Sequence, residues 1–88
     1  MKIKESFVLR QVAGTWVVLP LKQDTVNFNG VIRLNNSGAL LWQQLEKDSD
    51  RQTLIQTLTG QYHVSPEQAA KDVEEFLQIL KKVGCLEE

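Results

Sequence analysis

The first third of the chain carries short runs of β-branched, aromatic and aliphatic residues that are separated by turn residues. These runs predict two strands, at about residues 6–12 and 15–20, because such residues pack well on a pleated sheet. Ala13 and Gly14 between them predict the tight turn of a β-hairpin. Pro20 has no amide hydrogen for a ladder, so we expect the second strand to end there.

A polar stretch, Lys22–Asn29, follows the hairpin and predicts a loop. Residues 30–34 then predict a third, short strand. Alternation along this strand places Ile32 and Leu34 on one face and Arg33 on the other. If the strand lies at the edge of the sheet, its unpaired backbone groups either need protection or accept an added strand from a peptide.

Apolar residues recur at helical spacing through the rest of the chain and predict three helices, at about residues 36–47, 50–62 and 66–83. Asn35 or Asn36 can cap the first helix, since an asparagine oxygen accepts from the free amides of the first turn. The three helices follow the three strands in sequence. This order predicts an α+β fold.

The second and third predicted helices begin with capping signals. Ser49-Asp50-Arg51-Gln52 has the form of a capping box, with Ser49 as the cap. Ser65-Pro66-Glu67-Gln68 has the same form and adds a proline at the first helical position. Gly84 stands where a left-handed cap would end the third helix.

The size and composition of the chain are those of a small globular protein. The chain has 88 residues, so we expect a single domain over residues 1–88. Hydrophobic residues make up 42% and charged residues 24%, which is enough apolar material for one core. The net charge of −1 argues against strong nonspecific binding to nucleic acid or to anionic membranes.

The residues that catalysis and metal binding need are scarce. His63 and Cys85 are the only histidine and the only cysteine, and they lie 22 positions apart. This spacing predicts neither a zinc site nor a Cys-His catalytic pair. No glycine-rich phosphate-binding loop is present. We therefore expect a protein that is not an enzyme and that uses no metal or cofactor.

Two further features bear on the cellular compartment. Residues 1–5 lack the apolar stretch of a signal peptide. No window reaches the run of about 18 apolar residues that a membrane helix needs. A single cysteine excludes an intrachain disulfide. Together these features predict a cytoplasmic protein that is not bound to a membrane.

The third predicted helix has more apolar surface than one neighbour covers. On a helical wheel its apolar residues span about 180°, whereas a surface helix needs a stripe of roughly 100° or somewhat more. The excess lies on the edge that carries Phe76, Ile79 and Val83. Two interpretations remain open at this point. Either neighbours or a second copy of the chain cover this edge, or it borders a groove that accepts an apolar side chain of a peptide.

Charge is distributed unevenly along the chain. Residues 1–35 carry five basic and two acidic residues, a net +3, and residues 36–88 carry five basic and nine acidic residues, a net −4. A mildly basic sheet suits an acidic peptide segment. Ordinary scatter in so short a chain explains the difference equally well.

One long stretch resembles a known family. Residues 30–42, Gly-Val-Ile-Arg-Leu-Asn-Asn-Ser-Gly-Ala-Leu-Leu-Trp, resemble the strand-to-helix region of PqqD-like proteins, the family of protein D of pyrroloquinoline quinone biosynthesis. The resemblance continues through Thr53–Leu58, Tyr62, Asp72–Leu80 and the ending Val83–Leu86. It covers roughly residues 6–86, and it rests on the joint order and spacing of these segments, since no single motif is diagnostic.

The resemblance implies a winged-helix-like domain with a three-stranded antiparallel sheet and three helices. It also implies a function as a recognition element for ribosomally synthesised, post-translationally modified peptides (RiPPs). Members of the family bind the leader segment of a precursor peptide, which adds a strand to the third strand and lies against the third helix. They act as peptide chaperones for a modifying enzyme, such as a radical SAM maturase.

Carried onto this sequence, the resemblance implies peptide-binding residues on two elements. They are Val31, Ile32, Arg33 and Leu34 of the third strand and Asp72, Phe76, Ile79 and Val83 of the third helix. The opposite edge of the helix, with Ala70, Leu77 and Lys81, is the alternative. We favour the first edge because its apolar excess has no other evident use.

Two other classes of function compete with peptide recognition. Helices two and three resemble the order of a helix-turn-helix, which suggests a DNA-binding winged helix. That function needs a basic recognition helix, whereas the third helix sets four acidic residues against three lysines. The second alternative is a structural protein without a peptide ligand. It would form a homodimer through the apolar edge of the third helix and the unpaired edge of the third strand. We expect a monomer or a weak homodimer.

Overall fold

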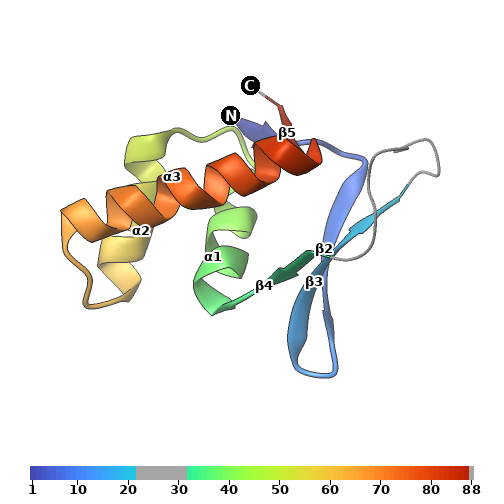
Figure 1. Cartoon of the computed structure of the whole chain (residues 1–88), viewed down its shortest axis with the longest axis horizontal. Helices are drawn as coiled ribbons and strands as arrows, with labels where there is room; N and C mark the ends of the chain where they lie inside the picture. Colours follow the sequence, from blue (N-terminus) through green and yellow to red (C-terminus); the bar gives the residue numbers. More distant parts are fainter. Residues whose placement is uncertain (22–31, 88) are drawn as a thin grey trace.

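A three-stranded antiparallel sheet and the three helices that follow it in sequence make up most of the described chain (Figure 1). The computed structural model describes residues 1–21 and 32–87. The strands pair in the order β2-β3-β4, and the helices form a second group beside them. The elements are β2 (Phe7–Val12), β3 (Thr15–Pro20), β4 (Ile32–Leu34), α1 (Asn36–Leu45), α2 (Arg51–Gln61) and α3 (Pro66–Val83). The predicted α+β fold is confirmed.

The β2-β3 hairpin turns over the two residues that the sequence predicted. Val12 pairs with Thr15, so only Ala13 and Gly14 form the loop. Their φ angles are 51° and 78°, which are the positive values that a two-residue turn of the I′ type requires. Glycine adopts such values freely, whereas Ala13 does so at a steric cost. Pro20 is the last residue of β3, as predicted.

A second, two-stranded sheet was not predicted. β1 (Lys2–Ile3) pairs antiparallel with β5 (Leu86–Glu87), with Ile3 opposite Leu86. The amide of Lys4 extends the contact by donating to the carbonyl oxygen of Cys85 at 2.9 Å. Strands of two residues are too short to show a period of two, so only the packing of the two ends of the described chain reveals them.

The helix starts agree with the predicted positions, with two corrections. Asn35 caps α1 and Ser65 caps α3. The cap of α2 is Asp50, whose carboxylate accepts from the amide of Thr53, and not Ser49 as predicted. The amide of Ser49 donates to the carbonyl oxygen of Met1 at 2.8 Å, which holds Ser49 one residue before the cap. The backbone hydrogen bond from Thr53 is the main reason why the pKa of Asp50 is lowered.

The second correction concerns α3. Its predicted capping box is only half formed, because the Gln68 side chain does not return to the start of the helix. Gln68 Nε2 instead donates to Asp72 Oδ1, one turn along, at 2.9 Å. The far end follows the prediction, since Gly84 caps α3 with a left-handed φ of 86°. α1 and α2 are also shorter than predicted, ending at Leu45 and Gln61.

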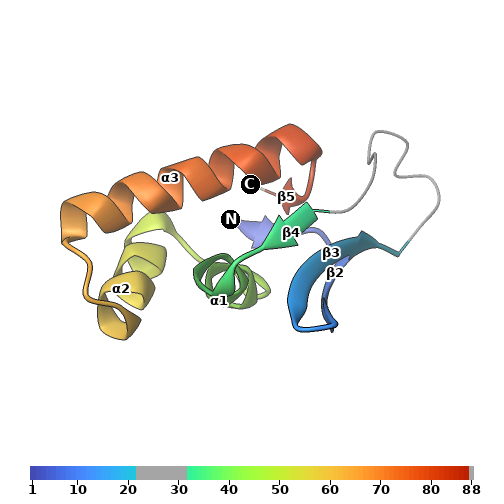
Figure 2. The same ribbon diagram turned by 60° about the horizontal axis from the view of Figure 1, so that its bottom comes forward.

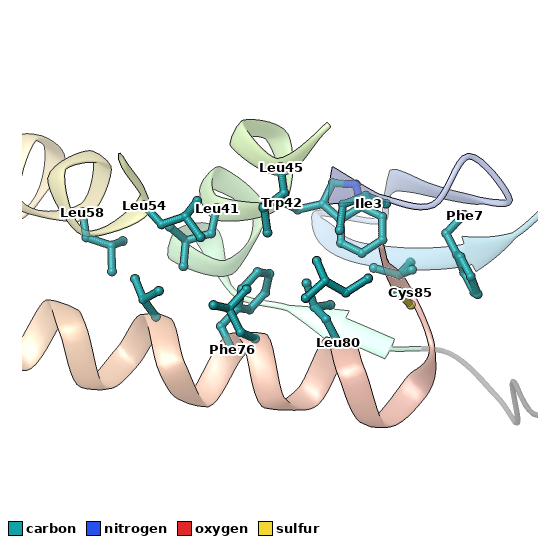
Figure 3. Packing of buried hydrophobic residues seen from close by; sticks show 14 of the residues in the cluster. Ile3, Phe7, Leu41, Trp42, Leu45, Leu54, Leu58, Phe76, Leu80 and Cys85 are labelled. Atoms are coloured by element: carbon teal, nitrogen blue, oxygen red, sulfur yellow. The ribbon is translucent and has the colours of Figure 1, made fainter. Parts of the chain in front are cut away.

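The core lies where α3 crosses the other elements. Figure 2 shows α3 lying along α2, α1 and β4. In Figure 3 the side chains of Phe76 and Leu80 point from α3 towards Leu41 and Trp42 of α1. Trp42, Leu45, Leu54, Leu77 and Leu80 are fully enclosed. Within the described residues, no helix is long and apolar enough to cross a membrane.

Candidate functional site

β4 forms one edge of the described sheet. β3 pairs with it on one side, with Val18 opposite Ile32 and Trp16 opposite Leu34, and no strand in the described part of the chain pairs with the other side. Ile32 and Leu34 pack against the core, while Arg33 is exposed. The predicted alternation of the strand is therefore confirmed, and with no partner strand among residues 1–21 and 32–87 this edge can accept a further strand.

A groove of about 530 Å³ lies beside this edge. It is bordered by the end of β4, the first turns of α1, one residue of α2 and one face of α3. The lining residues are Arg33, Leu34, Asn35, Ser37, Gly38, Leu41, Leu58, Asp72, Glu75, Phe76 and Ile79. The floor is mainly apolar and the rim is polar, which is the usual composition of a site that takes an apolar side chain.

The junction between β4 and α1 shapes one wall of the groove. Asn35 Oδ1 accepts from the amide of Gly38 at 2.8 Å and from the hydroxyl of Ser37 at 3.0 Å. A Cβ at Gly38 would lie 3.1 Å from that oxygen and 3.4 Å from the Cβ of Leu34. The absence of a side chain at Gly38 therefore lets the first turn of α1 close tightly on the end of the strand.

α3 forms the opposite wall with the edge that the sequence favoured. Phe76 is 8% exposed and reaches both the core and the groove, whereas Ile79 is 49% exposed. Val83 is half-buried and packs against the core. On the alternative edge, Leu77 is fully buried in the core and does not line the groove.

The rim of the groove carries charge of both signs. Arg33 contributes a guanidinium from the strand side, and Asp72 and Glu75 contribute carboxylates from α3. The amide of Gln68 holds the Asp72 carboxylate in place through the 2.9 Å hydrogen bond described above. The expected basic surface of the sheet is thus balanced, at the groove, by the acidic wall of the helix.

The structure brings together five of the eight predicted site residues. They are Arg33, Leu34, Asp72, Phe76 and Ile79. Ile32 and Val83 do not line the groove, because their side chains pack against the core. Val31 lies outside the described residues.

Sequence reasoning missed six lining residues. They are Asn35, Ser37, Gly38, Leu41, Leu58 and Glu75. The first three follow β4 directly, so their place at the end of an edge strand was a usable signal. Nothing in the sequence pointed to Leu58, because its position depends on how α2 packs against α3.

Among the described residues that line the groove, there is neither a cysteine nor a histidine. Cys85 is enclosed in the core, and burial raises the pKa of its thiol to about 11. The thiolate, which is the reactive form, is therefore disfavoured at neutral pH. Among residues 1–21 and 32–87, no group of three or more His, Cys, Asp or Glu is placed to hold a metal ion.

An open groove beside a free strand edge is typical of proteins that bind extended peptides by strand addition. The sequence profile of the family described as coenzyme PQQ synthesis protein D (PqqD) matches residues 15–86. The chain therefore belongs to the PqqD family. No curated protein matches the chain significantly.

Two solved structures have a similar fold. The first is TbiB1 in complex with the TbiA(beta) leader peptide, with 23% identity, a TM-score of 0.79 and coverage of 99% of this chain and 95% of that one. The second is lasso peptide synthetase B1 complexed with the leader peptide, with 23% identity, a TM-score of 0.75 and coverage of 96% and 93%. At this identity the similarity shows a shared fold.

Proposed function

We propose that this protein binds the leader segment of a ribosomally made precursor peptide as an added strand along β4. In this function residues 1–88 act as one recognition domain without catalysis of their own. The bound precursor is then presented to a separate modifying enzyme in the cytoplasm, such as a radical SAM maturase.

The observation that carries this proposal is the edge of β4, which has no partner strand in the described part of the chain and lies beside an apolar groove. Arg33 and Leu34 belong to both features. An extended peptide on this edge would satisfy main-chain groups of the strand and, at alternate positions, direct side chains towards Phe76 and Ile79.

Magnitudes indicate that main-chain pairing alone is too weak. The described strand has three residues, which gives about two or three new hydrogen bonds, each with a net value of about 0.5–1.5 kcal/mol. Association costs at least about 4 kcal/mol in lost translational and rotational freedom. The apolar contacts with the groove must therefore supply most of the affinity, and the exposed Ile79 and the groove-lining face of Phe76 are placed to do so.

The relatives support the same proposal. TbiB1 and lasso peptide synthetase B1, whose fold this chain shares, are both complexed with leader peptides. The match to the PqqD family profile adds a similarity in sequence to this similarity in fold. A nucleic-acid partner fits the groove less well, because Asp72 and Glu75 on its α3 wall would repel phosphate groups.

The direct test is a titration of the isotope-labelled chain with the leader segment of a short precursor peptide encoded beside its gene, followed by NMR. We expect the largest amide shifts at Arg33 in β4 and around Ile79 in α3. A leader in which proline replaces a strand-forming residue should bind much more weakly, because it loses a ladder donor. Binding that leaves both regions unshifted would contradict the proposal.

A further inference from the structure

A second hollow, of about 390 Å³, adjoins the groove. Asn35, Ser37, Leu58 and Asp72 line both hollows. The second hollow continues from this shared neck to Tyr62 and Val64, in the connection between α2 and α3. The two hollows therefore form one path that starts beside β4 and passes the first turn of α1.

Each hollow contains one exposed large apolar side chain. Tyr62 is 42% exposed in the second hollow and Ile79 is 49% exposed in the first. The backbone of Tyr62 is held at both of its groups, because its amide donates to the carbonyl oxygen of Leu58 and its own carbonyl oxygen accepts from Val64, both at 2.9 Å. An exposed aromatic ring on a fixed backbone can gain apolar contact with little loss of conformational freedom.

The course of the chain indicates which part of a ligand would reach Tyr62. β4 ends at Leu34, and the chain turns into α1 at the cap residue Asn35. A peptide that runs beyond Leu34 has no further strand to pair with in the described part of the chain. Its side chains must then provide the contacts, first across the polar neck of Asn35, Ser37 and Asp72 and then in the second hollow.

We propose that the second hollow binds a second apolar side chain of the same peptide, from the part that runs past the carboxyl end of β4. This inference rests on the proposed function. The recognised segment would then contain two apolar residues, one for the Phe76–Ile79 region and one for Tyr62, with polar residues between them for the neck. Tyr62 is a specificity-determining residue in this arrangement, although it lies outside the strand and outside α3.

The experiment uses a peptide selected from a randomised display library against the whole chain, with affinity measured by fluorescence anisotropy. Tyr62→Ala should weaken binding by about tenfold, the loss expected when the apolar contact of one aromatic ring is removed. Tyr62→Phe should retain the affinity, because the ring remains. Val12→Ala is the matched control, since Val12 is 56% exposed on the hairpin and lines neither hollow.

Truncation of the peptide then separates the two hollows. The peptide is shortened at the end that runs past Leu34. The shortened peptide should bind the parent and Tyr62→Ala equally well, while Ile79→Ala should still weaken its binding. If Tyr62→Ala leaves the affinity of the full peptide unchanged and Ile79→Ala lowers it, the second hollow is not used and only the proposed function stands. If neither variant lowers the affinity of a peptide that binds, the groove is not the site and both proposals fall.

Discussion

Two faces of α3 have the same kind of residue and opposite surroundings. The first face carries Ala69, Val73, Leu77 and Leu80, none of which is more than 1% exposed. The second face carries Phe76 and Ile79, and there Ile79 is half exposed. The spacing of apolar residues is helical on both faces, so it predicts that each is sheltered. The described chain shelters the first face completely, whereas on the second face it buries Phe76 and leaves Ile79 half exposed.

The physical reason for the difference lies in the neighbours of each face. The first face packs against the other helices and the ends of the chain, where side chains such as Leu45 and Leu54 fill the space. The second face meets the edge of β4, where the described chain supplies no further strand. An apolar face that its own fold leaves partly uncovered is a place for a partner, and the two faces should therefore respond differently to substitution.

The largest expected loss of stability follows from a substitution on the buried face of α3. Leu77→Ala should lower the free energy of unfolding by about 3–5 kcal/mol, because it leaves a cavity in a fully enclosed position. Urea denaturation followed by circular dichroism measures this loss. The exposed Lys71 on the same helix provides the control, since Lys71→Ala should change stability by no more than about 0.5 kcal/mol. A loss of stability below about 1 kcal/mol for Leu77→Ala would contradict the assignment of this face to the core.

Substitution of Phe76 should lower both the stability of the fold and the affinity for the peptide, because Phe76 touches the core and the groove. Phe76→Ala should lower the free energy of unfolding by about 2–4 kcal/mol, somewhat less than a fully enclosed aromatic residue, since the groove already leaves one side open. The folded fraction should also bind the leader peptide more weakly. Denaturation and anisotropy on the same sample separate the two losses. An unchanged affinity would assign Phe76 to the core alone.

Ile79 should affect binding and leave stability nearly unchanged. Ile79→Asp should change the free energy of unfolding by no more than about 1 kcal/mol, because the side chain is half exposed. It should weaken leader binding by at least about tenfold, because a carboxylate in an apolar groove must lose its hydration. Val12→Asp, at another exposed apolar position, should bind as the parent does. A variant at Ile79 with parental affinity would exclude this face from the site.

The smallest expected effect concerns a third position on α3. Glu74 accepts from Arg51 of α2 at 2.9 Å, and this hydrogen bond lowers the pKa of Glu74 below its ordinary value of 4.5. A lowered pKa in the folded state means that the pair stabilises the fold above pH 4.5 and that this contribution is lost as the pH falls through the folded pKa. The pair is exposed, so the effect is small.

Acid titration of stability tests this expectation. The urea midpoint of the parent should fall more steeply below pH 4.5 than that of Glu74→Gln, in which the titrating group is gone. Leader binding at neutral pH should be the same in both proteins, since Glu74 does not line the groove. Identical pH profiles would show that the cross-helix pair contributes nothing measurable.

Much of the fold could be predicted because local rules act within a few residues. The Ala13-Gly14 turn, the end of β3 at Pro20 and the bounds of α3 between Ser65 and Gly84 all follow from backbone geometry or from caps. The cap of α2 was predicted one residue too early. Ser49 and Asp50 are both good capping residues, and a contact between Ser49 and the distant Met1 decided between them.

The candidate site was predicted in part for the same reason. The periodicity of α3 identified an apolar edge with Phe76 and Ile79, and the short strand identified Arg33 and Leu34. Val83 has the same helical spacing, yet its position near the end of α3 brings it against the core. A helical wheel shows the direction of a side chain around the axis and carries no information on what lies beside it along the axis.

The sequence by itself determined the α+β order, the hairpin and the apolar excess of α3, because these depend on residue preference and on spacing along the chain. The tertiary structure alone decided that β4 is an edge strand of the described sheet, that Leu58 of α2 lines the groove, and that a second hollow reaches Tyr62. These features join elements that are far apart in sequence. Their positions follow from how the core packs, and that packing is a property of the whole described chain.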